Sequence, residues 1–368
     1  MDLERILPAT QVWPYNFSLG FIAKFRGRMT DSAAATAHPS RTPSEQLFML
    51  TGAFMHYRAL QTAAELELAD HLANGPLDVG ALATRSKAHV PSLFRMMRTL
   101  ESVGVFKQVS PRVFANTPVS ELLRRGVPGS QWAYVRSVSP GGGIYEAWSG
   151  FTYSVRTGKP AFEQIHGCSI WEFMRRHPAQ AAVFDEFMRS AQAAMTPAAT
   201  AALDWSRFPV IADIGGGIGG QLVDILNAHS SCKGILFDQP HVIARAAPHE
   251  RIERVAGNFF ERMPDGADAY ILRRVIHDWA DQEAVAILNT VRAAVKPDSR
   301  VILIEFTLPE TSEYAYGKTA DLTMLALTGG QERTATEYRQ LLDKAGFEVE
   351  QVIATPAQTS LVIGRPRN

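Results

Sequence analysis

The sequence predicts an α/β protein in which a mostly parallel sheet, with helices on both faces and an antiparallel hairpin at one edge, follows a mostly helical domain. Three observations support this prediction. From residue 209 on, short apolar segments without polar alternation are separated by helical patterns, which is typical of strands buried on both faces. The last two strand-like segments are separated only by a short turn, so they can pair only as an antiparallel hairpin. The residues before 129 follow a different order of elements.

The first domain is expected over residues 43–128, after an N-terminal extension (1–42) that is partly flexible. Large apolar residues recur at roughly helical spacing over 46–73, which indicates one or two helices. A short helix (78–86), a turn, a helix opened by Pro91 and two short strands around a Ser-Pro turn follow. Helix, turn, helix and hairpin is the order of a winged helix.

A winged helix often binds DNA, and its second helix here carries Arg95 and Arg98. Residues 43–126, however, contain nine Lys and Arg against seven Asp and Glu, whereas a surface that follows phosphates needs a denser basic patch. The helices are also apolar over more than one face. This excess favours a dimer interface, and therefore a homodimer, over nucleic-acid binding.

The composition is that of a globular protein of more than one domain: 368 residues, 46% hydrophobic and 20% charged. Lys plus Arg and Asp plus Glu both number 37, so the net charge gives no reason to expect nucleic acid or a membrane surface as partner. No segment approaches the ~20 apolar residues of a membrane span, and Pro8 and Pro14 interrupt the N-terminus before an export signal can form. The two cysteines match no metal or redox spacing and indicate a cytoplasmic protein.

Residues 129–204 are expected to form a helical linker region rich in aromatic residues and methionine, and residues 205–368 the last domain. Core packing explains any single Phe or Met of the linker region. Taken together, these side chains predict the wall of a pocket for a flat apolar ligand. The expected lining residues are Trp148, Phe184, Met188 and Met195, with Met324 from the last domain.

The last domain alternates strands and helices. The expected segments, in order, are 209–214, 219–229, 233–238, 240–247, 252–257, 268–279, 282–295 and 300–307, followed by a helix and the edge hairpin within 335–366.

A glycine-rich stretch, VIADIGGGIGG (210–220), follows the first of these strands. Gly215, Gly217 and Gly220 satisfy the G-x-G-x-x-G pattern of dinucleotide-binding proteins. Glycines after a strand let the backbone approach a ligand closely, whatever that ligand is. Asp213 decides between ligands, because a carboxylate is poorly placed beside a pyrophosphate at a helix N-terminus. It suits the sulfonium and the protonated amine of S-adenosylmethionine.

Two further residues at strand ends point to the same ligand and its chemistry. Asp238 ends the second strand, where an acid binds the ribose diol in NAD and S-adenosylmethionine proteins alike; its structural alternative is an ordinary turn Asp. His277, followed by Asp278 and Trp279, ends a later strand at the carboxyl edge of the sheet, where the sites of open α/β proteins lie. This placement favours a catalytic over a structural histidine.

The motifs taken in order resemble a family of small-molecule O-methyltransferases. The resemblance rests on DIGGGIG (213–219), Asp238, GNFF (257–260), RRVIHDW (273–279), ILIEFTLPE (302–310) and GGQERTATEYRQLLDKAGF (329–347), and it covers nearly the whole chain from about residue 45. These are class I S-adenosylmethionine enzymes of the plant caffeate and flavonoid type, with bacterial members that methylate polyketides and other aromatic natural products. The resemblance implies a Rossmann-like methyltransferase sheet and an S-adenosylmethionine-dependent O-methyltransferase of secondary metabolism, including antibiotic biosynthesis.

The resemblance also assigns roles. The cofactor-binding residues it implies are Asp213, Gly215, Gly217, Asp238, Asn258, Phe259 and Arg273, and the catalytic residues are His277, Glu305 and Glu332. His277 would be the general base for a phenol, whose pKa near ~10 leaves little phenolate at neutral pH, and the two acids would orient its imidazole. Their structural alternatives are a surface Glu at a strand end and a Glu at a helix N-terminus.

Three departures from the plant members bear on details. Asn258 replaces the usual Asp beside the adenine, and Arg273 replaces a Lys. The sequence ALTGGQER lacks the Asn-Pro that holds a propenoid substrate in plant members, which favours a polycyclic or heteroaromatic acceptor. No convincing carboxylate cluster for a metal is evident, so we expect metal-independent transfer. N-methylation, a non-methylating decarboxylase or hydroxylase, an NAD-dependent oxidoreductase and a DNA-binding regulator stay open as alternatives.

Overall fold

The computed structural model describes residues 42–367, without the side chains of residues 192–194, and divides them into two compact units. The first unit comprises residues 42–139 and 182–190, and the second comprises residues 140–181 and 191–367. The N-terminal extension and its lack of an export signal fall, except for Thr42, outside the described residues. The long helix α11 (Pro178–Ala201) contributes residues to both units.

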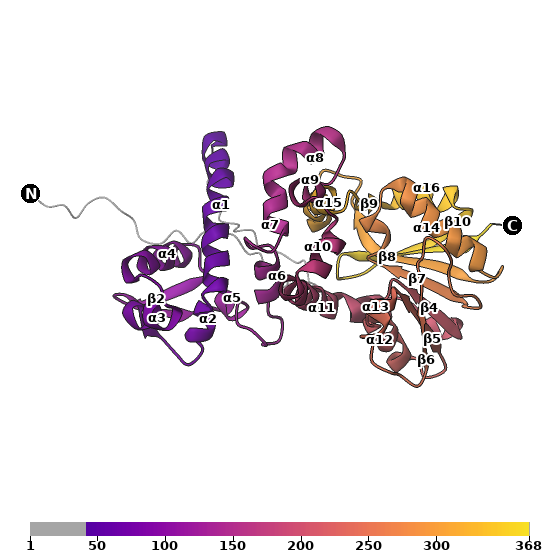
Figure 1. Cartoon of the computed structure of the whole chain (residues 1–368), viewed down its shortest axis with the longest axis horizontal. Helices are drawn as coiled ribbons and strands as arrows, with labels where there is room; N and C mark the ends of the chain where they lie inside the picture. Colours follow the sequence, from indigo (N-terminus) through magenta and orange to yellow (C-terminus); the bar gives the residue numbers. More distant parts are fainter. Residues whose placement is uncertain (1–41, 368) are drawn as a thin grey trace, which may run out of the picture. The chain divides into compact units, whose positions relative to one another are not determined.

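The first unit has the winged-helix order expected from its sequence (Figure 1). Its elements are α1 (Pro43–Glu65), α2 (Leu68–His71), β1 (Leu77–Asp78), α3 (Val79–Ser86), α4 (Val90–Ser102), β2 (Phe106–Ser110), β3 (Val113–Asn116), α5 (Pro118–Glu121) and α6 (Trp132–Ser137). Strands β2 and β3 form the predicted hairpin, and the short β1 pairs with β3 to complete an antiparallel sheet. Leu82, Met97 and Phe114 are fully buried among these elements, because the apolar faces of α3 and α4 pack on the sheet.

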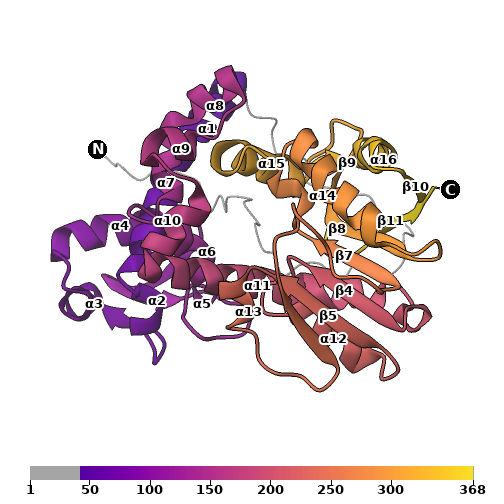
Figure 2. The ribbon, with the colours of Figure 1, turned by 45° about the vertical axis from the view of Figure 1, so that its right-hand side comes forward.

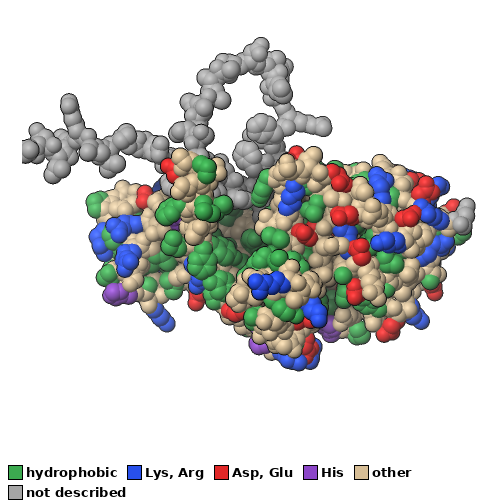
Figure 3. Space-filling model, turned by 90° about the horizontal axis from the view of Figure 1, so that it is seen from above, with side chains coloured by type: hydrophobic (Ala, Val, Ile, Leu, Met, Phe, Trp, Pro, Cys, Tyr) green, Lys and Arg blue, Asp and Glu red, His purple; other side chains and the backbone are tan. Residues whose placement is uncertain are grey.

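Helix α1 leaves a large apolar face exposed. A Thr42 capping box starts the helix, with the backbone amide of Glu45 bonded to the Thr42 side chain. The exposed large side chains are Leu47, Phe48, Leu50, Phe54, Met55 and Tyr57. Figure 3, which colours residues by type, shows hydrophobic side chains in green on one face of the molecule. Single exposed apolar residues are normal, but a contiguous set on one helix marks an interaction surface.

The second unit contains the predicted sheet. Its strand order is β10-β11-β8-β7-β4-β5-β6, with β9 beside the end of β8. Strands β4 to β8 run parallel, and β11 is antiparallel both to β8 and to the edge strand β10. The strands are β4 (Val210–Ile214), β5 (Lys233–Asp238), β6 (Ile252–Ala256), β7 (Ala269–Arg273), β8 (Arg300–Leu308), β9 (Arg333–Thr334), β10 (Phe347–Ala354) and β11 (Thr359–Pro366). The mixed sheet and its antiparallel edge confirm the predicted fold class.

Helices cover both faces of this sheet (Figure 2). The helices α14 (Asp281–Ala294) and α16 (Ala335–Lys344) bury their apolar faces on one side, and α12 (Gly220–Ala228) and the end of α11 bury theirs on the other. The central strands are buried almost throughout, which explains their unbroken hydrophobicity in the sequence. The short α13 (Pro240–Ile243) follows β5.

Residues 140–181 form a run of short helices rather than long ones. They are α7 (Ile144–Ala147), the 3-10 turn η1 (Trp148–Gly150), α8 (Phe151–Thr157), α9 (Ala161–His166) and α10 (Ile170–Arg176). Glycines end α8 and α9 in the left-handed conformation. Helix α15 (Tyr316–Leu327) contacts α7, α8 and α9. No helix in the part of the chain that the structure describes is long and apolar enough to cross a membrane.

Candidate active site

Asp213 lies at the end of β4 with its carboxylate buried under the glycine loop. It is 1% exposed, and neither carboxylate oxygen has a hydrogen-bond partner among the described residues. A Cβ atom on Gly216 would lie 2.6 Å from Cγ of Asp213, so the loop passes directly over the acid. Burial raises the pKa of Asp213 to about 7. A buried carboxylate is stabilised by nearby positive charge; the Arg273 guanidinium supplies part of it, and the amine and sulfonium of S-adenosylmethionine would add to it.

Hydrogen bonds to residues of the neighbouring strand β5 fix the glycine loop. Gly215 and Gly217 adopt φ angles of 65° and 61°, which favour glycine. The amide of Gly215 donates to the carbonyl of Phe237, and the amide of Gly217 donates to Oδ2 of Asp238 at 2.8 Å. A Cβ atom on Gly217 would meet nothing within 4 Å. The loop therefore leaves open space beside the Asp238 carboxylate, as the ribose-binding prediction requires.

Asn258 and Phe259 follow β6 at the same edge of the sheet. Asn258 is exposed and bonded to Glu261, while the ring of Phe259 lies edge-on to Trp279 with centroids 6.0 Å apart. Phe260 packs on Trp279 at 4.7 Å. A Cβ atom on Gly215 would lie 3.8 Å from the Phe259 ring, so this aromatic cluster adjoins the glycine loop. Phe260 and Trp279 were not among the predicted cofactor-binding residues.

Arg273, the last residue of β7, is paired in register with Ile304 of β8. Its positive charge opposes the burial that raises the pKa of Asp213. Arg273 comes from the strand next to β4 and interacts electrostatically with Asp213; its contact with the cofactor stays a prediction.

His277 does not end a strand, as the sequence had indicated, but lies in a 3-10 turn, η3 (Ile276–Asp278), four residues after β7. The strand ends because Arg274 adopts a left-handed φ of 55°, which extended strands do not accommodate. The amide of Arg274 still donates to the carbonyl of Ile304. The turn places the His277 ring above the carboxyl edge of the sheet with 6% of the residue exposed.

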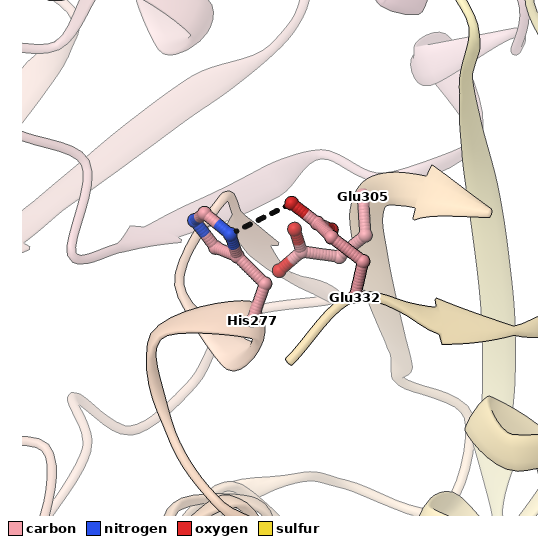
Figure 4. Close-up of side chains that lie close together, drawn as sticks. All are labelled: His277, Glu305 and Glu332. Carbon is pink, nitrogen blue, oxygen red and sulfur yellow. Dashed lines mark hydrogen bonds and ion pairs between the residues drawn. The ribbon is translucent and has the colours of Figure 1, made fainter. Parts of the chain in front are cut away.

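The predicted catalytic residues come together from three separate segments (Figure 4). Nδ1 of His277 lies 3.1 Å from Oε1 of Glu332, a residue of the loop before β9. Glu305 lies on β8 and is fully buried, and its Oε1 accepts hydrogen bonds from the amides of Val275 and Ile276. The alternatives of a surface Glu305 and of a Glu332 at a helix N-terminus are therefore wrong.

The three acids near His277 determine its charge. Burial and the Arg274 guanidinium lower the pKa of His277, but Asp278, Glu305 and the hydrogen bond to Glu332 more than offset them, so its pKa lies above the usual value. Burial opposes ionisation of Glu332 as well, yet its contacts with His277 and Arg274 lower its pKa below the usual value. Glu332 is therefore the charged acceptor for an Nδ1 proton. Nε2 lies 3.6 Å from Asp278, beyond hydrogen-bond range.

The loop Gly330–Gln331 packs directly on the backbone of η3, the turn that carries His277, a feature the sequence did not reveal. A Cβ atom on Gly330 would lie 2.1 Å from the carbonyl oxygen of His277, and the amide of Gln331 donates to that same oxygen at 2.9 Å. Arg333, 1% exposed, donates to the carbonyl of Trp279 and to the Asp281 carboxylate. These contacts explain why Gly-Gly-x-Glu-Arg occurs as one motif.

The predicted pocket residues belong to both units. Trp148 in η1 is 38% exposed, and Met324 on α15 is half-buried in the second unit. Phe184 and Met188 are half-buried on α11 in the first unit, where the ring of Phe184 lies edge-on to Phe187. Met195, further along α11, is half-buried in the second unit. A shared lining for all five stays a prediction.

His277, Glu305 and Glu332 each offer one ligand atom within 4.8 Å of the others, and the sequence had shown no such cluster. One histidine and two carboxylates could hold a divalent cation. A guanidinium is already there, however, because Arg274 contacts Glu332 at 2.9 Å and Glu305 at 3.6 Å. A metal ion would have to displace this charge.

A parallel sheet with a glycine loop over a buried acid, and an acid-flanked histidine at the same edge, defines a class I methyltransferase. The comparison with known families agrees. Residues 148–348 match the O-methyltransferase domain, and residues 48–126 match the O-methyltransferase dimerisation domain. The chain belongs to this family and is an S-adenosylmethionine-dependent O-methyltransferase. Membership decides against the oxidoreductase and DNA-binding regulator alternatives.

Individual relatives show the range of the family. The chain is 37% identical over 345 residues to the phenazine O-methyltransferase PhzM of Lysobacter antibioticus, covering 92% of this chain and 100% of that one. It is 34% identical to the 8-amino-8-demethylriboflavin N,N-dimethyltransferase of Streptomyces davaonensis, covering 85% and 93%. A solved structure of NcsB1, an O-methyltransferase from neocarzinostatin biosynthesis, in complex with S-adenosylmethionine and 2-hydroxy-5-methyl naphthoic acid, is 31% identical to this chain. Its TM-score is 0.75, and the match covers 84% of this chain and 95% of that one.

Proposed function

We propose that the enzyme methylates a hydroxyl group of an aromatic or polyketide-like small molecule in secondary metabolism, with His277 as the general base. The observation that carries this proposal is the bond between Nδ1 of His277 and the buried Glu332 carboxylate. This bond fixes the tautomer with the proton on Nδ1, because a charged carboxylate accepts and does not donate. Nε2 then has a lone pair with which to take a proton.

Proton transfer would proceed as follows. Nε2 of His277 would accept the hydroxyl proton of the bound acceptor as its oxygen bonds to the methyl carbon, and the methyl–sulfur bond would break with its electron pair left on neutral S-adenosylhomocysteine. The imidazolium that forms is stabilised by Glu332, Glu305 and Asp278, the acids that raise its pKa. S-adenosylmethionine supplies an electrophilic methyl group on a sulfonium. Proximity of the two reactants contributes the rest of the acceleration.

The residues proposed to hold the cofactor are those at the carboxyl edges of β4, β5 and β6. Asp213 would face the cationic part, Gly215 and Gly217 would pass beneath the methionine, and Asp238 would bind the ribose. The aromatic cluster beside Phe259 would adjoin the adenine together with Asn258. The unpartnered, buried carboxylate of Asp213 supports this assignment, and Arg273 would contact the cofactor or a neighbouring acid.

The proposed acceptor is a polycyclic or heteroaromatic phenol. The names of the relatives, which describe a phenazine and a naphthoate ligand, support this class, and so do the aromatic and methionine side chains predicted to line the pocket. N-methylation is a second candidate, because a relative of 34% identity is named as an N,N-dimethyltransferase. It needs the same methyl donor but an amine acceptor.

We further propose that the enzyme is a homodimer formed through residues 43–128. Residues 129–204 would line the acceptor pocket, residues 205–368 would carry the chemistry, and residues 1–42 would be an N-terminal extension. The match to a dimerisation domain and the exposed apolar face of α1 support the dimer. Transfer is proposed to need no metal, because Arg274 balances the acids beside His277. A cytoplasmic location agrees with the two free cysteines, Cys168 and Cys232.

The base assignment is tested with His277→Ala. The assay uses the phenolic acceptor that the wild type methylates fastest among a panel of hydroxynaphthoic acids and phenazinols. We expect the variant to bind S-adenosylmethionine as the wild type does but to lose most of its turnover on this acceptor, by about 10²–10⁴-fold. His229→Ala, a half-buried histidine after α12, is the matched control. Undiminished turnover of His277→Ala would remove the base assignment and leave proximity as the main catalytic effect.

A further inference from the structure

Arg274 lies at the centre of the charged cluster around His277, and the family motifs assign it no role. Its guanidinium contacts Glu332 through Nη2 at 2.9 Å and Nη1 at 3.1 Å, and Glu305 through Nη1 at 3.6 Å. The opposite face of the guanidinium stacks on Phe306, 4.2 Å from the ring centroid. Only 19% of the side chain is exposed.

The cluster needs such a cation. Asp278, Glu305 and Glu332 bring three carboxyl groups close to a single imidazole, and Glu305 and Glu332 are buried completely or nearly so. A buried charge without a partner is strongly destabilising. Oε2 of Glu305 has no hydrogen-bond partner among the described residues, so the guanidinium is its nearest compensation. Without Arg274 the negative charge of the acids would not be balanced, and the cluster of acids and imidazole would hold a proton to higher pH.

The backbone is bent to make these contacts possible. A residue continuing β7 would alternate to the other face of the sheet, whereas the left-handed φ of 55° at Arg274 turns the chain at this point. Left-handed conformations cost about 1 kcal/mol or more for residues other than glycine. The surrounding contacts must offset that cost, and the bonds to Glu332 and the stacking on Phe306 are the contacts that the side chain makes.

We propose that Arg274 is a positioning residue for the methyl transfer: it holds the Glu332 carboxylate against Nδ1 of His277 and balances the acids that surround the base. This inference rests on the proposed role of His277 as the general base. The acidic and phenolic groups near the imidazole or its partners are Asp278 on η3, Glu305 on β8, Asp321 on α15, Glu332 before β9, and Tyr338 on α16. Two further cations act on this set: Arg273 on Glu305, and Arg333 on Asp321 and Tyr338. Arg274 is the cation that pairs with two of the acids, Glu305 and Glu332.

Arg274 also opposes protonation of the base. Its charge lowers the pKa of His277, while the acids raise it. When the guanidinium is lost, its positive charge no longer offsets the carboxylates, so the His277 imidazole keeps its proton to higher pH. We expect the acid limb of kcat/KM for Arg274→Met to move upward by about one pH unit, which lowers kcat/KM about tenfold at any pH below both limbs. Wild-type activity should likewise rise with pH until the raised His277 pKa is passed.

The conservative variant separates charge from geometry. Lysine keeps the charge but cannot make two parallel bonds or stack its planar group on Phe306. For Arg274→Lys we therefore expect an acid limb close to that of the wild type but a lower kcat, because Glu332 is held less firmly. Arg251→Met is the matched control, since that arginine donates to four backbone carbonyls of the same unit but has no contact with the cluster. It should lower stability without moving the limb.

A charge-balanced double variant keeps the test valid if Arg274→Met does not fold. Arg274→Met with Glu305→Gln removes one charge of each sign, and the glutamine oxygen can still accept the amides of Val275 and Ile276. We expect this variant to fold and its acid limb to return toward the wild-type position. The protonation of His277 is followed independently of turnover by NMR of histidine-labelled protein bound to S-adenosylhomocysteine.

The outcomes are distinct. An Arg274→Met protein that is folded, with an acid limb and a His277 titration like those of the wild type, would overturn the inference. So would a double variant whose limb moves as far as that of Arg274→Met alone. If His277→Ala keeps its turnover, the proposed base is wrong whatever Arg274 does. If His277→Ala is inactive while Arg274→Met behaves as wild type, only the role of Arg274 is wrong.

Discussion

Gly330 has no room for a side chain. Gly330→Ala should therefore lower the rate of methyl transfer, although Gly330 is not one of the proposed reacting residues. The added Cβ would lie 2.1 Å from the carbonyl oxygen of His277 and 2.4 Å from the carbonyl carbon of Asp278. Both atoms are backbone, so no side-chain rotation relieves the clash. A contact of at least ~3 Å requires the loop or the turn to move by about 1 Å. Overpacking of this kind costs typically ~1–3 kcal/mol of stability.

The displacement would lengthen two hydrogen bonds that hold His277 in place. The bond from Gln331 to the His277 carbonyl is 2.9 Å long, and the one between His277 and Glu332 is 3.1 Å long. A shift of about 1 Å carries either bond beyond hydrogen-bond range. Misplacement by that distance can reduce a rate by about 10²-fold. We expect kcat to fall by about that factor, while affinity for S-adenosylhomocysteine changes little.

The assay combines steady-state kinetics, calorimetric titration with S-adenosylhomocysteine and thermal unfolding. Asn227→Ala is the control, because the residue is exposed near the end of α12 and alanine favours a helix more than asparagine does. That substitution should leave kcat unchanged and raise stability slightly. A Gly330→Ala protein with wild-type kcat and melting temperature would refute the argument that this loop positions the base.

Three other predictions follow from the site and the first unit. Asp213→Asn should weaken binding of S-adenosylmethionine about tenfold, measured by calorimetry. Without ligand, the stability of the wild type relative to this variant should fall as pH rises from about 4 to 7, because burial raises the Asp213 pKa from 3.8 to about 7. Thermal melts of both proteins at matched pH test this, and a difference in stability that stays constant with pH would contradict it. Leu50→Glu with Phe54→Glu on α1 should yield monomers in analytical ultracentrifugation, whereas Val155→Glu, at an exposed residue of the second unit, should not. Dialysis against EDTA should leave turnover unchanged, because Arg274 already balances the acids; a loss restored by Mg²⁺ or Zn²⁺ would contradict this expectation.

Local sequence patterns were sufficient for the cofactor side of the site. The loop after β4 and the acid before it form one continuous strand-turn-helix segment, so the glycine pattern and Asp213 are visible in eleven residues. Asp238 could be placed because β5 is parallel to β4 and ends at the same edge. The helices and hairpin of the first unit were predictable for the same reason, since periodicity and turn residues are local properties.

The catalytic side depended on contacts between distant segments. His277 and Glu332 are 55 residues apart, and Arg274 and Glu332 are 58 apart, so periodicity could not show that they meet. The left-handed turn at Arg274, which takes His277 off the strand, has no local sequence mark such as glycine. The division of residues 140–181 into several short helices was likewise not predicted from the sequence, which indicated only a helical region.

The sequence alone determined the fold class, the place of the glycine loop and the position of Asp213 before it, because these depend on neighbours along the chain and on hydrophobic periodicity. Only the tertiary structure decided how the base is held. Glu305, Glu332 and Arg274 reach His277 from a central strand, from a loop that requires glycine at its closest approach, and from a bent strand end. Such an arrangement is set by the packing of segments far apart in the chain, and a buried charge cluster becomes visible only when that packing is known.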